Sequence, residues 1–119
     1  MQPIGALLKD RNIILRGADA ATGRGFTQVP NFLLRSSKLS SGDKLAFAML
    51  LSYAWQNDFC FPGQKRLGED MGIDERNVRR HLKALEANGL LSIQRRGQGK
   101  TNIYELNLKP RDLKKRHLS

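Results

Sequence analysis

Five polar side chains between positions 76 and 83 have the types and spacing best suited to chemistry: Arg76, Asn77, Arg79, Arg80 and Lys83. An arginine guanidinium can donate two parallel hydrogen bonds to the O6 and N7 atoms of guanine, and an asparagine amide can pair similarly with adenine. Lysine adds a compact positive charge that suits a phosphate. The set therefore predicts contact with nucleic acid, and no arrangement of acids, bases or nucleophiles in the sequence predicts a catalytic site.

A helix must carry these side chains, because apolar residues recur among them at helical spacing. Val78, Leu82 and Leu85 lie at i, i+4 and i+7, which predicts one buried stripe. At about 100° per residue, Arg76, Arg80 and Lys83 fall almost opposite this stripe, and Arg79 and Asn77 lie on its flanks. A helix that is anchored on one side and cationic on the other suits the major groove of DNA. The alternative is an amphipathic helix whose basic face is only solvated.

A shorter helix is expected immediately before it. Leu67 and Met71 are four residues apart, with the small Gly68 beside them, and Gly72 suits the left-handed conformation that often ends a helix. Asp74 can then accept hydrogen bonds from the free N–H groups of the next helix. The two helices and their tight turn predict a helix-turn-helix, in which Lys65 and Arg66 of the first helix are placed to meet the phosphate backbone.

A β-hairpin is expected after the second helix. Asn88-Gly89 ends the helix, Leu91 and Ile93 alternate with polar residues, and a loop over 97–101 contains two glycines. The alternation returns over 102–108, with Tyr104, Leu106 and Leu108 on one face, and Pro110 closes the strand. This hairpin would form a wing with a basic tip, whose Arg95, Arg96 and Lys100 would grip phosphates or reach a minor groove.

These runs resemble a known family. The segment from about Phe26 to Leu108 is similar to the bacterial winged-helix domains of plasmid replication initiators, phage replisome organisers and related regulators. The resemblance is carried by FTQVPNFLL, LGEDMGIDERNVRRHLKALEANGLL and SIQRRGQGKTNIYEL. It implies an α+β, mainly α, winged helix-turn-helix with a three-helix core, and it implies DNA binding without indicating which DNA process is served.

The first helix of that core is expected between Ser40 and about Gln56. Ser40 and Asp43 fit a capping box. The helix is apolar nearly all round, so it must be covered on every side. We expect it to pack between the DNA-reading helix and the N-terminal segment, and the alternative is that part of it forms a dimer interface. Trp55, Phe59 and Phe61 are expected to fill the core, with Pro62 starting the next helix.

The rest of the chain divides into an arm and a tail. Residues 1–25 are expected to be an N-terminal arm and linker, residues 26–108 the DNA-binding domain, and residues 109–119 a basic tail. Within the domain, residues 26–29 are expected to form a short strand, and Asn31 to cap a helical turn through Leu34. The formal net charge of +10 and a pI near 10.4 fit a polyanion partner or an acidic membrane surface.

Several other functions find no support in the sequence. No apolar run approaches the roughly 20 residues that span a bilayer. Cys60, the single cysteine, cannot form an internal disulfide, which favours a reducing cytoplasm. Neither Cys60 nor His81 has metal-ligand spacing around it, and His81 is expected to pack or to bond a backbone carbonyl. The glycine-bearing loop lacks the spacing of a nucleotide-binding P-loop, so no cofactor or metal is expected.

The sequence therefore predicts sequence-specific binding of double-stranded DNA. We rank transcriptional regulation ahead of replication initiation, because the chain ends soon after the wing. A winged-helix module that mediates protein contacts in a nucleoprotein assembly is the alternative of another class. RNA binding is disfavoured because the cationic face has no aromatic side chain for stacking. A homodimer through the 44–55 helix or the N-terminal arm is also expected.

Overall fold

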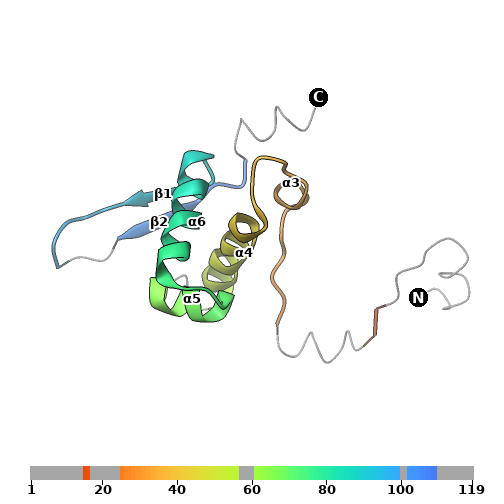
Figure 1. Ribbon diagram of the computed structural model, residues 1–119, viewed down its shortest axis with the longest axis horizontal. Helices are drawn as coiled ribbons and strands as arrows, with labels where there is room; N and C mark the ends of the chain where they lie inside the picture. The colour runs from red at the N-terminus through yellow and green to blue at the C-terminus, as the bar shows by residue number, and fades with distance from the viewer. Residues whose placement is uncertain (1–14, 17–24, 57–60, 100–101, 110–119) are drawn as a thin grey trace, which may run out of the picture.

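A computed structural model describes residues 15–16, 25–56, 61–99 and 102–109, and these residues form four helices followed by a β-hairpin (Figure 1). The helices are α3 (Asn31–Leu34), α4 (Ser41–Gln56), α5 (Gln64–Met71) and α6 (Glu75–Ala87). The strands are β1 (Leu91–Gln94) and β2 (Ile103–Leu106). The predicted α+β, mainly helical architecture, with three core helices and a wing, is confirmed.

Helix α4 begins with the predicted capping box. The backbone N–H of Ser40 donates to Oδ2 of Asp43 at 3.0 Å, and the N–H of Asp43 donates to Oγ of Ser40 at 3.1 Å. These two bonds satisfy backbone donors that a helix N-terminus otherwise leaves free. The start of α4 is therefore fixed by the local sequence.

The hydrophobic core lies around α4. Phe47, Leu67, Leu85 and Val78 are fully buried, so α4, α5 and α6 each contribute side chains to one cluster. Leu33 of α3 is also fully buried in this cluster. Helix α4 packs against both α5 and α6, as predicted for a central helix. This packing makes α6 part of a rigid body and leaves only one of its faces available to a partner.

The wing is a two-stranded antiparallel hairpin that extends away from the helices (Figure 1). Leu91 pairs with Leu106, and Ile93 pairs with Tyr104. Leu91 is buried, and the other three contact the core from partly buried positions. The apolar face of the hairpin therefore anchors it to the helices.

Two predictions for the N-terminal part of the domain are wrong. Residues 26–29 form no strand, because the described part of the chain contains one sheet and its two strands, β1 and β2, pair with each other. Asn31 does not cap α3, because the backbone at Pro30 is extended (φ −61°, ψ 140°) and Pro30 is itself the N-cap, with no side-chain cap bond.

Three predictions further along the chain also need correction. Pro62 does not start α5, because Gly63 has φ 112° and the helix begins only at Gln64. Trp55 does not fill the core: it is 66% exposed, since the last turn of α4 directs it away from the packed helices. Strand β2 ends at Leu106, so Leu108 lies outside the ladder and is exposed. Phe59 and Pro110 lie outside the described residues.

Candidate nucleic-acid interface

The turn between α5 and α6 sets the orientation of the candidate reading helix. Gly72 has the left-handed conformation that was predicted (φ 74°, ψ 31°), and the N–H of Ile73 donates to the carbonyl of Gly68 at 3.0 Å. A Cβ at Gly68 would lie 2.8 Å from the carbonyl oxygen of Ile73, so only glycine lets the turn fold back this closely. The two glycines thus fix the angle between the helices.

Helix α6 is capped and anchored as predicted. The Asp74 side chain accepts a hydrogen bond from the N–H of Asn77 at 2.9 Å. Val78, Leu82 and Leu85 are buried, with exposed fractions of 0%, 3% and 0%. The apolar stripe faces α4, α5 and the wing, so the opposite side of the helix is the one that reaches solvent.

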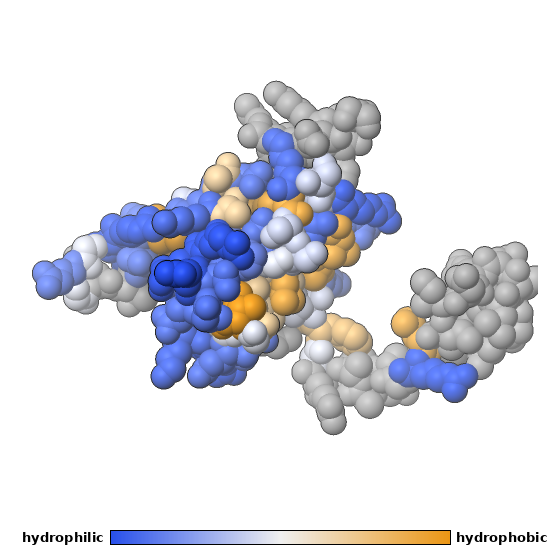
Figure 2. All heavy atoms as spheres, viewed as in Figure 1, coloured by the Kyte–Doolittle hydropathy of each residue, from blue (hydrophilic) through white to orange (hydrophobic). Residues whose placement is uncertain are grey.

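That opposite side carries the predicted cations. Arg76, Arg79, Arg80 and Lys83 are all exposed, and within the described residues their side chains form no hydrogen bond or ion pair. Figure 2 shows strongly hydrophilic residues gathered over the region where Figure 1 places α6 and α5. Asn77 is half-buried at the edge of this surface, in keeping with its expected place on the flank. The four uncompensated charges form what we call the cationic face.

The wing brings further positive charge beside α6. Arg95 and Arg96 directly follow β1 and are exposed. The Nη1 atom of Arg95 lies 4.0 Å from Oε2 of Glu86, near the C-terminal end of α6. An exposed ion pair this long contributes little to stability, so Arg95 remains available to a stronger anionic partner. Lys100 lies outside the described residues.

Helix α5 adds two cations with different surroundings. Lys65 is exposed and has no side-chain partner in the described part. The Nε of Arg66 donates to both carboxylate oxygens of Asp70 at 3.1 Å, and the hydroxyl of Tyr53 donates to Oδ2 of Asp70 at 2.7 Å. The carboxylate therefore holds Arg66 by Nε, leaving its terminal N–H groups for another acceptor.

This cluster perturbs the ionisation of its members. Burial and the hydrogen bond to Asp70 raise the pKa of Tyr53. The hydrogen bonds from Tyr53 and Arg66 lower the pKa of Asp70, and the bond to Asp70 raises the pKa of Arg66. The carboxylate is thus kept ionised and Arg66 is kept charged. The surface position of Arg66 was predicted from the sequence, but its contact with Asp70 and the contact of Asp70 with Tyr53, 17 residues away, were not.

A second polar contact was also missed. His81 was expected to pack or to bond a neighbouring carbonyl; its side chain does pack, and its hydrogen-bond partner is a carboxylate, with Nδ1 lying 2.8 Å from Oδ1 of Asp43. Both side chains are mostly buried, with exposed fractions of 13% and 9%. The carboxylate that caps α4 therefore also bonds α6. The described residues contain no group of His, Cys, Asp and Glu side chains that could hold a metal ion.

Comparison with known proteins identifies the fold. Residues 37–91 match the family model of a helix-turn-helix domain. This segment runs from the residues before α4 through α5 and α6 to the start of β1. No curated protein sequence matches the chain as a relative. The described part contains no helix with the length and apolar character needed to cross a membrane.

Two solved structures are similar in fold over most of the chain. One is titled "N-Terminal domain of DNA binding protein"; it is 24% identical, with a TM-score of 0.58, and the match covers 90% of this chain and 94% of that one. The other, "Structure of Rep-DNA complex", is also 24% identical with a TM-score of 0.58, and the match covers 80% of this chain and 83% of that one. The winged helix-turn-helix fold therefore extends beyond the segment matched by the family model.

Proposed function

We propose that the chain binds double-stranded DNA through this winged helix-turn-helix, with α6 in the major groove and the wing beside it. The observation that carries the proposal is the cationic face: four exposed cations on one side of a helix whose other side is fully buried. Four unpaired like charges repel one another, so the arrangement is stabilised by a polyanion. Two solved structures of the same fold, one named as a DNA-binding protein and one as a DNA complex, support this function.

The residues divide into two roles. Arg76 and Arg80 lie opposite the buried stripe and are the candidates for bidentate contacts to guanine. Lys83 and Arg79 flank them, and Lys65, Arg66, Arg95 and Arg96 lie on neighbouring elements where phosphates pass. Phosphate contacts fix the position of the protein on the duplex, whereas base contacts select the sequence.

Two processes compete for this binding activity. The first candidate is transcriptional regulation, which requires a DNA-binding surface such as the cationic face of α6. The similarity in fold to the protein of a Rep–DNA complex favours the second candidate, binding at a replication origin. The two differ in where the bound site lies, upstream of a gene or within an origin that the protein itself activates.

Selection of bound sites from a random duplex library tests the proposal. We expect a defined consensus, and Arg76→Ala or Arg80→Ala should weaken binding to it by about 1–3 kcal/mol while relaxing preference at one base pair each. Arg35→Ala is the matched control, because Arg35 is an exposed arginine at the end of α3, outside the candidate interface. Equal losses on consensus and random duplexes would assign these arginines to phosphates, and unchanged binding would overturn the proposal.

A further inference from the structure

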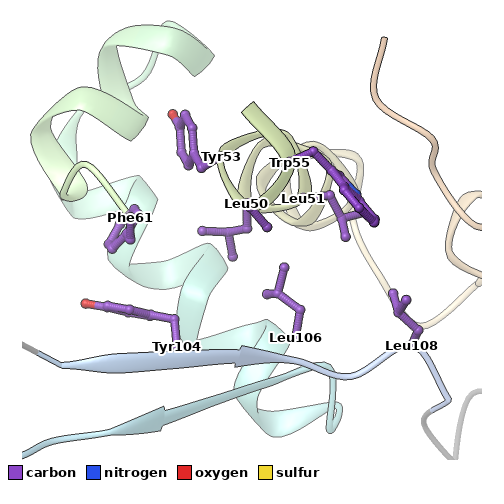
Figure 3. Close-up of a pocket in the computed structure, with 9 residues that line it drawn as sticks. Leu50, Leu51, Tyr53, Trp55, Phe61, Tyr104, Leu106 and Leu108 are labelled. Atoms are coloured by element: carbon purple, nitrogen blue, oxygen red, sulfur yellow. The ribbon is translucent and has the colours of Figure 1, made fainter. Parts of the chain in front are cut away.

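An apolar groove lies between α4 and the wing, and none of the candidate DNA-binding residues in the described part of the chain lines it. The pocket has a volume of about 260 Å³ and is lined by uncharged residues of α4 and β2 together with Phe61 and Leu108. Figure 3 shows Tyr53, Phe61 and Tyr104 at one end, and Trp55 and Leu108 at the other. A second pocket of about 390 Å³ adjoins it, sharing Leu51, Trp55 and Leu108. Together the two pockets form what we call the apolar groove.

The groove exposes unusually large apolar side chains. Trp55 is 66% exposed and Leu108 48% exposed. A contiguous apolar surface of this kind usually marks a site where another chain segment or partner binds. The aromatic ring of Trp55 adds to this, since tryptophan is enriched at the centre of interfaces. We therefore expect another chain segment or a partner to cover the exposed apolar surface of α4. The nearly all-apolar sequence of this helix led to the same expectation.

The candidate occupants differ in shape and charge. A second copy would present its own groove, and a concave surface is not filled by another concave surface. The C-terminal residues 110–119 include four basic side chains and only two leucines, whereas the described residues that line the groove include no charged side chain to attract them. Residues 2–8, with the sequence QPIGALL, have no charge and contain Ile4, Leu7 and Leu8.

We propose that the N-terminal segment over residues 4–8 binds in the apolar groove of its own chain. The chain re-enters the described domain beside the groove, because Gln28 and Val29 line the second pocket. The nineteen residues between Leu8 and Gln28 span at most about 70 Å, so the segment can reach every part of the groove without a second copy. Binding within one chain is also favoured over binding between chains by the high effective concentration of a tethered segment.

Trp55 provides a direct test, because it is the single tryptophan of the chain and lines both pockets. Its emission and its quenching by acrylamide are to be measured in the full chain and in the variant Leu7→Ser with Leu8→Ser. In the wild type we expect blue-shifted emission and weak quenching. In the variant we expect a red shift and a quenching constant that rises towards that of a free tryptophan derivative.

The matched control is Gln2→Ser with Asn12→Ser, which changes polar residues of the same arm and should leave Trp55 as in the wild type. Equal thermal melting of all three proteins ensures that the difference arises at the groove.

Quenching that is identical in wild type and the leucine variant would overturn the proposal. Sedimentation distinguishes binding within one chain from exchange of arms between two chains. Shielding of Trp55 that appears only as the protein dimerises would show that arms are exchanged, and this result would also contradict the proposal. No DNA is present, so these outcomes are independent of the proposed function.

Discussion

The imidazole of His81 lies in hydrogen-bond contact with the carboxylate of Asp43, with 2.8 Å between Nδ1 and Oδ1. The other oxygen of the same carboxylate accepts the N–H of Ser40. Because an ionised carboxylate only accepts hydrogen bonds, the ring donates through Nδ1. One side chain thus caps α4 and holds α6, which couples the start of the central helix to the helix that carries the cationic face.

The ring of His81 requires a glycine beneath it. A Cβ at Gly42 would overlap the Cε1 and Nε2 atoms of the ring. We expect Gly42→Ala to destabilise the domain, because overpacking costs about 1–3 kcal/mol and outweighs the roughly 1 kcal/mol by which alanine is favoured in helices. In the background of His81→Ala the same change should cost less or become stabilising. Urea unfolding of the wild type, the two single variants and the double variant measures this coupling. Strictly additive changes in the free energy of unfolding would show that the ring does not lie over Gly42.

The cluster of Tyr53, Arg66 and Asp70 predicts a pH dependence of stability. The hydrogen bonds to Asp70 lower its pKa from the ordinary value of 3.8 in the folded protein. The unfolded chain therefore takes up a proton at higher pH than the folded one, so the contribution of this carboxylate to stability is complete above pH 3.8 and is lost as pH falls through the lower folded pKa.

Asp70→Asn tests this dependence. The difference in unfolding free energy between wild type and variant should be constant near neutral pH and should shrink as the pH falls below about 4. Glu69→Gln is the control, because the Glu69 side chain has no hydrogen-bond partner in the described residues. A difference that does not change with acidification would mean that the bonds to Asp70 do not favour its ionised form.

The buried stripe of α6 should tolerate no charge. Val78→Asp or Leu82→Asp would place an unpaired carboxylate at a position with 0% or 3% exposure, and we expect a loss of at least about 3 kcal/mol, enough to unfold a marginally stable domain. Lys83→Asp, one residue from Leu82 but exposed, should melt near the wild-type temperature and weaken only DNA binding. Wild-type melting of both stripe variants would mean that the stripe faces solvent.

The C-terminal residues should add affinity without adding specificity. Five basic residues and one acid lie between Lys109 and Ser119, so we expect this tail to follow phosphates beyond the wing. Each neutralised phosphate contributes about −0.9 to the slope of log K against log salt, and removal of residues 110–119 should flatten that slope by roughly two to four units. The selected consensus should stay the same. An unaltered slope would leave the tail as a solvated end, and a changed consensus would mean that it reads bases.

The parts of the fold that follow from local chemistry were predictable. Asp74 caps α6, Gly72 ends α5, and Ser40 with Asp43 starts α4, because each interaction joins residues within a few positions of one another. The buried stripe and the exposed cations of α6 follow from one periodicity, so they were predicted together.

Interactions between distant parts of the chain were not predictable in this way. The sequence separation between His81 and Asp43 is 38 residues, and periodicity contains no information on which polar side chains will meet across helices. The exposure of Trp55 was missed for a related reason: an apolar helix indicates that its surface needs cover, but it does not indicate which side the neighbouring helices leave open.

The central claim, that α6 reads guanines in the major groove, is tested most directly by methylation of guanine N7 with dimethyl sulfate on the selected duplex. N7 lies in the major groove and is one of the two acceptors that a bidentate arginine occupies. Bound wild-type protein should protect the guanines of the consensus from methylation. Arg76→Ala and Arg80→Ala should each restore methylation at one guanine while the other guanines remain protected. Full methylation of every consensus guanine under saturating wild-type protein would contradict the claim.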